Sequence, residues 1–453
     1  MARAKKEAAL TPEERLQAAL VPDWEWPYKL PENWCWTTVG AINQYVGISS
    51  NPTKAKNETF ELYSVPSSAD NYPEIVLGAD IGSTKQSVKK GDVLLCKINP
   101  RINRVWKVSK YTDHSLLASS EWIVVRNSRL ISNYLMWCFR SPYFRGYMLS
   151  NVSGVGGSLM RAQPKFVQGY PVPVPPRAEQ QRIVDRIESL FAKLDEAKEK
   201  AQAVVDSFET RKAAILHKAF TGELTAKWRE EHDVGMESWE HHQFSDLCAI
   251  VRGGSPRPAG DPRYYDGNIP FMKVADITRN DSPYVSKVEY SIKEEGLKKT
   301  RKVEANTLLL TNSGATLGVP AITTIRTTFN DGIAAFIGID IDSLLFYYYF
   351  WTSKTAFLRS INMGAAQPNL NTKLIGEVEI DVPQTAERVE IARVLNALLS
   401  KEQQAKEAAE AVLGQIDLMK KSILARAFRG ELGTNDPSEE SALELLKRIL
   451  ESK

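Results

Sequence analysis

The sequence predicts an α+β protein in which two α/β domains are separated by two long helices, with a pseudo-two-fold internal repeat. The repeat is the first observation: the segment 179–224 recurs without a gap as 387–432, so Glu387 follows Glu179 by 208 positions (387 − 179). The second is an apolar residue at every third or fourth position through both copies, which is typical of helices that pack on helices. The third is the short β-type runs and turn signals between the copies.

The two apolar seams are expected to pack against each other as an antiparallel coiled coil. A helix of about 42 residues is roughly 60 Å long, and so long a seam rarely suits a single globule. Packing of each helix on its own domain alone is the alternative. Gly222 and Gly430 stand where such helices end. The expected interface residues of the first copy are Ile183, Ile187, Leu190, Leu194, Phe208, Ile215 and Phe220. Those of the second copy are Ile391, Leu395, Leu398, Ile416, Ile423 and Phe428, and Ala405, Ala409 and Val412 continue its apolar seam between Leu398 and Ile416.

The elements follow one another in a repeated order. Thr11 and Glu14 form a capping-box pattern around Pro12, which predicts a short helix through Leu20. The pseudo-symmetry then gives six segments, with the second domain repeating the order of the first. Their boundaries are 1–30 (helical extension), 31–176 (first domain), 177–232 (first long helix), 233–382 (second domain), 383–432 (second long helix) and 433–453, with an amphipathic helix at 438–450.

Inside the first domain, strands are expected at 93–95 and 121–125, a helix at 134–139 and an extended, Pro-rich exit at 170–176. Glycines 154, 156 and 157 indicate a loop. The second domain offers counterparts to several of these segments, and the offsets between them vary, so the domains have diverged while the long helices have not. The pairs are 32–34 with 237–239, 93–95 with 307–309, 134–141 with 346–353 and 162–164 with 366–368.

Composition limits the class of protein. Charge is nearly balanced at +3 over 453 residues, so no strongly basic or acidic tail is indicated. The four cysteines (Cys35, Cys96, Cys138 and Cys248) form no CxxC pair, which argues against a disulfide framework and a zinc site. The longest apolar run, 344–351, is too short for a membrane span, and the N-terminus resembles no signal peptide. We expect a soluble protein of the bacterial cytoplasm.

The sequence shows no motif for catalysis, metal or cofactor binding. The loop 314–318 lacks the lysine of a phosphate-binding loop. The adenine-methylating tetrapeptide Asp/Asn-Pro-Pro-Tyr/Phe is absent; the segment 261–264 comes nearest, but Arg263 replaces the second proline and a turn is the better interpretation. His241 and His242 are adjacent on an expected strand, where they point oppositely, so a solvated pair is favoured over a metal site. We expect a chain without enzymatic activity.

Clustered basic and amide side chains instead indicate contact with nucleic acid. Residues 31–176 contain 16 Lys or Arg and 9 Asp or Glu. Residues 233–382 contain 15 Lys or Arg and 18 Asp or Glu, and the basic residues of this range are clustered. Lys and Arg supply phosphate contacts, and Asn, Gln, Ser and Arg can read base edges. A solvated charged face is the alternative for any one cluster. The candidates are Lys97, Asn99, Arg101, Asn103, Arg104, Lys107, Ser158, Arg161, Gln163, Arg252, Ser255, Arg257, Lys273, Lys298, Lys299, Arg301, Asn312, Ser313, Thr316, Gln367 and Asn369.

The whole chain resembles the specificity (S) subunit of type I restriction–modification systems. The resemblance rests on six short motifs, which follow one another in the family's order along a chain with the duplicated helical segment. They are Pro31–Trp34, Gly91–Pro100, Pro175–Val184, Gly253–Pro256, Asn268–Ile277 and Ser313–Gly318. The second long helix departs from the family at its start, where Pro383–Arg388 replaces the usual PPLAEQQ. This difference does not interrupt the helix and puts in doubt only the contacts at its start.

This resemblance implies that the two domains are target-recognition domains, each reading one half of a split, asymmetric DNA target. It also implies a complex with two methyltransferase (M) subunits, which carry S-adenosylmethionine and methylate adenine N6, and two translocase–nuclease (R) subunits for restriction. Two other hypotheses remain. One is a self-contained nucleic-acid methyltransferase, which would need a cofactor loop. The other is a coiled-coil scaffold without a DNA role, against which the basic first domain argues.

Overall fold

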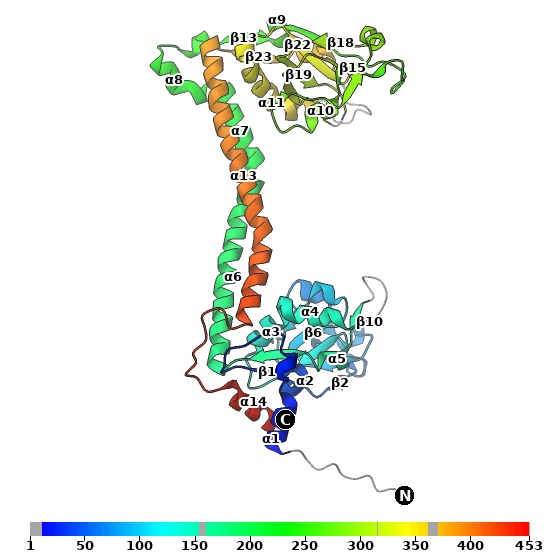
Figure 1. Cartoon of the computed structure of the whole chain (residues 1–453), viewed down its shortest axis with the longest axis vertical. Helices are drawn as coiled ribbons and strands as arrows, with labels where there is room; N and C mark the ends of the chain where they lie inside the picture. Colours follow the sequence, from blue (N-terminus) through cyan, green and yellow to red (C-terminus); the bar gives the residue numbers. More distant parts are fainter. Residues whose placement is uncertain (1–10, 154–159, 315, 361–369, 453) are drawn as a thin grey trace. The chain divides into compact units, whose positions relative to one another are not determined.

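The computed structural model describes residues 11–452 except 154–159, 315 and 361–369. The chain forms two compact units: the first joins residues 1–200 with 411–453, and the second comprises residues 201–410. The boundaries between the units fall inside the repeated helical segments. Each unit therefore contains one α/β domain together with a part of both long repeats (Figure 1).

The first unit contains short helices and small sheets. Thr11 caps the first helix with the expected box, because its hydroxyl accepts from Glu14 N (3.2 Å) while Glu14 Oε2 accepts from Thr11 N (2.8 Å). Strand orders are β2-β5-β8-β3-β4, β7-β6-β9, β1-β12 and β10-β11. The elements are α1 (Pro12–Ala19), β1 (Cys35–Thr38), α2 (Val39–Ile42), β2 (Ser49–Ser50), β3 (Thr59–Tyr63), β4 (Glu74–Leu77), β5 (Lys85–Ser87), β6 (Val93–Cys96), β7 (Val105–Lys107), β8 (Ser115–Ala118), β9 (Trp122–Val125), α3 (Ser132–Arg140), α4 (Pro142–Ser150), β10 (Val152–Ser153), β11 (Arg161–Ala162), α5 (Pro164–Val167), β12 (Pro171–Val174) and α14 (Ala442–Glu451).

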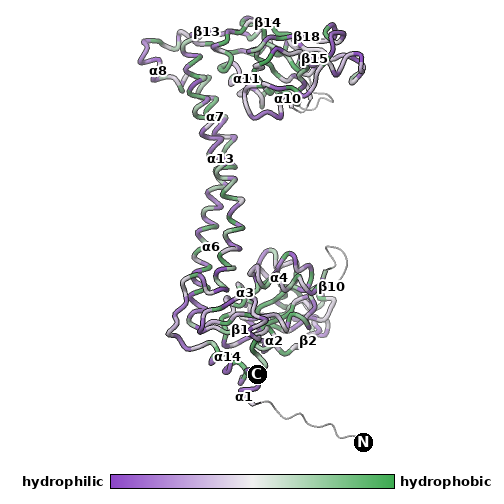
Figure 2. Tube along the Cα trace, viewed as in Figure 1, coloured by the Kyte–Doolittle hydropathy of each residue, from purple (hydrophilic) through white to green (hydrophobic). Residues whose placement is uncertain are grey.

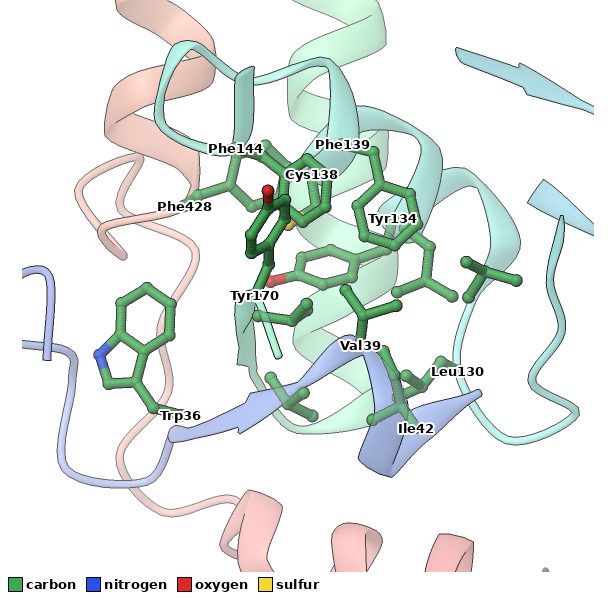
Figure 3. Packing of buried hydrophobic residues seen from close by; sticks show 14 of the residues in the cluster. Trp36, Val39, Ile42, Leu130, Tyr134, Cys138, Phe139, Phe144, Tyr170 and Phe428 are labelled. Carbon is green, nitrogen blue, oxygen red and sulfur yellow. The ribbon is translucent and has the colours of Figure 1, made fainter. Parts of the chain in front are cut away.

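The core of the first unit gathers apolar side chains from its helices and from both long repeats (Figure 3). Phe428, from the end of the second repeat, packs edge-on against Tyr134 of α3 with ring centroids 5.4 Å apart. Ile183 and Ile187, from the first repeat, are fully buried in the same cluster. Full burial of one such side chain contributes about 1.5–3 kcal/mol, so the ends of both repeats are integral to this domain.

The second unit also combines short helices with a five-stranded sheet, and its other sheets have four and two strands. Strand orders are β14-β22-β19-β20-β16, β17-β15-β21-β18 and β13-β23. The helix expected at 346–353 is confirmed and is longer. The elements are α7 (Phe208–Phe220), α8 (Ala226–Glu231), β13 (Glu240–Gln243), α9 (Phe244–Leu247), β14 (Ala249–Arg252), β15 (Tyr265–Met272), α10 (Val274–Thr278), β16 (Tyr284–Val285), β17 (Tyr290–Ile292), β18 (Arg301–Val303), β19 (Thr307–Thr311), β20 (Pro320–Thr323), β21 (Thr327–Phe329), β22 (Ile333–Ile337), α11 (Leu344–Ser360), α12 (Thr372–Gly376) and β23 (Glu379–Val382).

The long repeats are helical, but the first is not one helix. It divides into α6 (Arg177–Asp206) and α7 at Ser207, whereas the second is continuous as α13 (Thr385–Ala427). The Ser207 hydroxyl donates to Ala203 O, and Arg211 donates to Ser207 Oγ and to Val204 O. The backbone hydrogen bonds from Ser207 N to Ala203 O (3.1 Å) and from Arg211 N to Ser207 O (3.0 Å) are kept, so these side-chain bonds accompany a local distortion of the helix, in which Ser207 has φ −87° and ψ −2°. The expectation of one unbroken first helix is therefore wrong at this residue.

Within each unit, the two repeats run antiparallel. In the second unit, Lys406 lies over the Phe208 ring (4.7 Å) and Glu402 accepts from Arg211 (2.7 Å), so the numbering falls along α13 as it rises along α7. In the first unit, Lys420 of α13 pairs with Asp195 of α6. Gly222 and Gly430 have the positive φ values (78° and 76°) expected where the helices end.

The seam of α13 differs from the expected one in its middle. Ala405 is exposed, and Val412 is 42% exposed. Their places are taken by Glu402, Lys406 and Leu413, which are half-buried. A seam based only on apolar residues misses long charged side chains whose stems pack at the interface while their ends pair with the partner helix. Figure 2 shows polar and apolar residues interspersed along α6, α7 and α13.

Each domain begins and ends in a two-stranded antiparallel ladder. In the first unit, β1 pairs with β12, and in the second, β13 pairs with β23. The helix α1 adjoins the first ladder, where Thr37 Oγ1 donates to Ala19 O (2.7 Å), and β1 and β12 are buried. The second ladder is more exposed and polar: His241 shares a hydrogen bond with Asp381 (2.8 Å), and His242 one with Glu240 (3.3 Å).

Beside each ladder, a buried carboxylate joins the start of one repeat to the segment that follows the other. Glu179 Oε2 accepts from Trp34 Nε1 (2.7 Å) and Asn435 Nδ2 (2.9 Å), and Oε1 accepts from Thr434 Oγ1 (3.3 Å). We call these residues the Glu179 joint. In the second unit, Glu387 accepts from Trp239 Nε1 (3.0 Å), Thr225 Oγ1 (2.7 Å) and Arg229 Nη1 (2.6 Å). These residues form the Glu387 joint.

The C-terminal helix begins four residues later than expected. Asp436 Oδ1 accepts from Ser438 N (3.0 Å) and Ser438 Oγ (2.6 Å), and this turn replaces the helix over these residues. The helix α14 starts at Ala442 with Ser441 as its N-cap. In the part of the chain that the structure describes, no helix has the length and apolar character needed to cross a membrane.

Candidate nucleic-acid interface

In the first unit, the segment after β6 is fixed between two neighbours. Lys97 N donates to Glu121 O (2.9 Å), and Lys97 O accepts from Ala162 N (2.9 Å). Asn99 and Asn103 are left-handed (φ 46° and 55°) and flank the short turn 100–102. Asparagine tolerates this conformation better than most residues, so the sequence Asn-Pro-Arg-Ile-Asn forms a tight turn with its two middle residues, Arg101 and Ile102, exposed.

The tip of this loop is exposed and basic. Arg101 is exposed, and its carbonyl accepts from Arg145 Nη2 of α4. The neighbouring Ile102 is 53% exposed. Arg161, on β11, is also exposed and pairs with Glu121 (3.1 Å), and a bridge between Ile98 and Arg161 places the two segments side by side. The bridge therefore places Arg161 beside the segment that carries Lys97 and Arg101.

Three other predicted residues of this loop are partly engaged inside the unit. Lys107 Nζ donates to Asn133 Oδ1 of α3 (2.6 Å), and Asn103 Nδ2 donates to Arg140 O (3.1 Å). Arg104 lies against the Cys96 thiol, although burial is the main influence on that thiol and raises its pKa. Gln163 is half-buried before α5. Lys107 and Asn103 therefore hold the loop in place in this structure.

In the second unit, Gly253 and Gly254 allow two strand ends to meet. A Cβ on Gly253 would lie 2.3 Å from Asn330 O, and one on Gly254 would lie 2.4 Å from Lys299 O. Glycine is required because the backbones approach so closely. The predicted cluster Lys298, Lys299 and Arg301 is exposed on the turn 294–299 and β18, and this contact brings it next to Ser255.

The chain after these glycines forms a polar cluster around Asp331. Ser255 Oγ donates to Asp331 Oδ1 (2.6 Å), Arg252 Nε donates to Asp331 O (2.7 Å), and Arg257 lies 3.6 Å from Asp331 Oδ2. Burial tends to raise the pKa of the Asp331 carboxyl, but the Ser255 hydrogen bond and the two arginines lower it overall. Asp331 therefore stays ionised and holds Ser255 and Arg257 in position.

Asn312 does not fit its predicted role. It is fully buried, its N donates to Gly332 O (2.9 Å), and its O accepts from Leu370 N (2.7 Å). A side chain at this depth cannot reach DNA in this structure, because it follows the central strand β19 into the domain. Ser313 is half-buried and Thr316 exposed. The predicted residues Ser158, Gln367 and Asn369 lie outside the described residues.

Beside the predicted residues Ser255, Arg257 and Lys273, the structure places Tyr290, Asn330 and Asp331, which sequence reasoning missed. Lys273 Nζ lies 3.1 Å from the centroid of the Tyr290 ring. A cavity of about 290 Å³ is lined by both of these residues and by Ser255, Arg257, Asn330 and Asp331. These side chains come from segments up to 76 residues apart (331 − 255). The turn signal Asn330-Asp331-Gly332 between two apolar runs was the available clue.

Within 11–452, less the three gaps, no three His, Cys, Asp or Glu side chains are grouped to hold a metal ion. What the two units present are loops of Arg, Lys, Asn and Ser on ordered strand ends. Such groups can contact phosphates and the edges of bases.

Comparison with known proteins gives the family. Residues 236–411 match the family described as "Type I restriction modification DNA specificity domain". The EcoKI specificity subunit of Escherichia coli (strain K12) is 22% identical over 93% of this chain and 96% of its own length. Residues 236–411 belong to this family, and the chain is similar to type I specificity subunits over nearly its whole length.

Other members support this relationship at different coverage. The MjaIX specificity subunit of Methanocaldococcus jannaschii is 31% identical, but over only 37% of this chain and 40% of its own length. The HsdS subunit from Thermoanaerobacter tengcongensis has the same fold, with a TM-score of 0.69 and 20% identity over 90% of this chain and 100% of that one. That likeness shows the fold of this chain.

Proposed function

We propose that this specificity subunit reads a two-part, asymmetric DNA target, with one recognition domain for each half, and has no catalytic activity of its own. The observation that carries the proposal is the repeated frame with unlike loops. In both units, a two-stranded ladder and a buried carboxylate connect the domain to the helical repeats. The first presents a loop of arginines and left-handed asparagines, and the second a cavity beside a lysine cluster. Because the two domains present different surfaces on the same repeated helices, we expect them to recognise different DNA sequences in the two half-sites.

The partners that this function requires supply the chemistry. Two M subunits would bind S-adenosylmethionine and methylate adenine N6 in the two halves, and two R subunits would join for restriction. A solved chain from work on complex assembly and conformational transition of the type I R-M system resembles this chain, with a TM-score of 0.65 and 21% identity over 90% of this chain. That likeness supports the fold needed for such a complex. The cofactor belongs, on this proposal, to the M subunit.

The test is to express the chain with its M subunit in cells without other methylases and to sequence the methylated bases. A single two-part motif with unlike halves and a fixed gap is expected. The chain alone, purified free of M subunit, should transfer no labelled methyl group to DNA. Transfer by the chain alone would favour the self-contained methyltransferase, and failure of the complex to bind a random DNA library would favour the scaffold.

The helical repeats are proposed to set the gap between the half-sites. Adding four residues after Lys200, an exposed position on α6, lengthens a helix by about 6 Å. One base pair spans about 3.4 Å, so the gap should grow by roughly one to two base pairs. Four residues are close to one turn, which keeps the seam nearly in phase. Methylome sequencing that shows the old gap, or altered half-site bases, would contradict this prediction.

A further inference from the structure

The cavity of the second unit has the chemistry of a site for one nucleobase. Its volume of about 290 Å³ lies near the lower end for small-molecule sites, about 300–1,000 Å³. Tyr290, which is 40% exposed, contributes an aromatic wall, and Lys273 lies over its ring. Aromatic faces stack on bases irrespective of sequence, so a further polar group must supply any selectivity.

Asn330 is that group. It lies in the turn between β21 and β22, where Asn330 N donates to Met272 O (3.0 Å) and Asn330 O accepts from Ile333 N (3.1 Å). Its backbone is thereby fixed at the base of the cavity. Its side-chain oxygen is buried, and no group among the described residues donates to it. An unpaired buried acceptor costs about 1–3 kcal/mol, which a ligand with an N–H group would offset.

Gly332 makes room for this arrangement. A Cβ at Gly332 would lie 2.7 Å from Val274 Cγ2, 2.9 Å from Ser313 Oγ and 3.4 Å from Asn330 Nδ2. The absence of a side chain at this residue lets the Asn330 amide lie beside Ser313 at the end of β19. A side chain at Gly332 would therefore crowd both the Asn330 amide and the Ser313 hydroxyl.

The charges around the cavity argue against phosphate as the ligand. Asp331 is ionised and faces the same space as Arg257 and Lys273. An anion entering beside Asp331 would meet a fixed negative charge, whereas the neutral edge of a base would not. The free acceptor on Asn330 needs a donor, and the adjacent amide nitrogen can supply one in return. Asparagine makes this bidentate pair with N6 and N7 of adenine.

The geometry points to Asn330 as a specificity-determining residue that reads one adenine in the half-site of the second unit, with Tyr290 and Lys273 forming the wall beside that base. This inference rests on the proposed function, because it requires that the second unit read DNA. It goes further in naming the base and the residue. Neither Asn330 nor Tyr290 belongs to the residues that sequence motifs single out.

The test compares Asn330→Ala and Asn330→Asp with the exposed β15 control Asn268→Ala, each in the full chain with its M subunit. Methylome sequencing should show that Asn330→Ala loses discrimination by roughly 5- to 150-fold at one adenine of one half-site. Asn330→Asp should shift that position toward cytosine, because a carboxylate accepts from cytosine N4. The control should keep the original motif, and the other half-site should be unchanged in every variant.

A second measurement covers variants that methylate too weakly to sequence. Competition binding of the purified complex uses duplexes in which each target position is changed singly. Loss of discrimination at one A·T pair supports the inference. Equal weakening on all duplexes, or an unaltered motif in Asn330→Ala, overturns it. A wild-type complex that reads no two-part motif would instead defeat the proposed function, so the two failures are distinguishable.

Discussion

The Glu179 and Glu387 joints occupy equivalent places in the repeat, and each stabilises a buried carboxylate with a different set of donors. Each buries a carboxylate against a tryptophan N–H and a threonine hydroxyl. The Glu179 joint completes the set with the neutral amide of Asn435, whereas the Glu387 joint adds the guanidinium of Arg229, which is 9% exposed. A buried carboxylate held by neutral donors and one held by an opposite charge respond differently to substitution. The two joints therefore share the position of the buried carboxylate but not the charge of the groups that bind it.

The largest expected effect is at the Glu387 joint. Glu387→Gln leaves the buried Arg229 without a counter-charge, and breaking such a pair costs about 3–5 kcal/mol. Glu179→Gln is the matched control: its amide oxygen can still accept from Trp34 and Asn435, and its NH₂ can donate to Thr434, so a cost of about 1 kcal/mol or less is expected. Denaturant unfolding of both variants measures the difference. Adding Arg229→Met to Glu387→Gln should recover part of the loss; equal costs for the two single variants would refute the comparison.

The next effect contrasts the loops of the two units. Arg101 is exposed at the tip of its loop, so Arg101→Ala should cost roughly 1–3 kcal/mol of discrimination at the half-site read by the first unit if its guanidinium reaches a base edge. The half-site read by the second unit should be unaffected. Arg104→Ala, beside the Cys96 thiol, should relax the same half-site or none. Methylome sequencing separates these outcomes, and relaxation in both halves would contradict the assignment of one domain to each half.

A smaller effect is expected from phosphate contacts. Lys97→Ala should weaken binding about equally on specific and random DNA and should lower the slope of log K against log salt by about one unit. Lys298→Ala makes the same measurement on the second unit. An unchanged slope for either variant would identify that lysine as a solvated surface charge, and a loss confined to specific DNA would identify a base contact.

The smallest effect is pH dependence at the Glu179 joint. Burial raises the pKa of the Glu179 carboxyl above its ordinary value, and the bonds from Asn435, Trp34 and Thr434 oppose this only partly. The folded state therefore binds this proton more tightly than the unfolded state. Its contribution to stability is fully present below the ordinary glutamate pKa of about 4.3 and is lost as pH rises through the folded pKa. The unfolding free energy of the wild type relative to Glu179→Gln should fall as pH rises through this window; a constant or rising difference would show that the carboxyl is not perturbed.

The sequence predicted the frame well because the frame repeats. The offset of 208 paired Glu179 with Glu387, and the tryptophans Trp34 and Trp239 were recognised as counterparts, but no pattern linked each tryptophan to its carboxylate. That contact joins residues 145 positions apart and depends on tertiary packing. The break at Ser207 was missed because a serine within a heptad pattern is tolerated unless its hydroxyl bonds backward.

The candidate interface was predictable only in part. The loop 97–104 was recognised because its basic and amide residues are contiguous. Tyr290 lies in β17 and Asn330 follows β21, and both were missed because these strands come together only in the folded sheet, on either side of β15. Asn312 was misassigned because the sequence does not show that it follows a fully buried strand. Contiguous loops are readable from sequence, whereas cavities built from several strand ends are not.

The antiparallel ladder of β1 and β12 has a consequence for how such a chain can change over time. Cys35 is opposite Val174 and Thr38 opposite Pro171, so the two ends of the intervening domain lie next to each other in one hydrogen-bonded register. The second domain is bounded in the same way, with Glu240 opposite Val382. A recombination event that exchanges everything between the two strands would replace a whole domain while leaving the helical repeats, the buried carboxylates and the reading frame on either side unaltered. The ladder is therefore a natural crossover point at which a new half-target can be acquired in a single step.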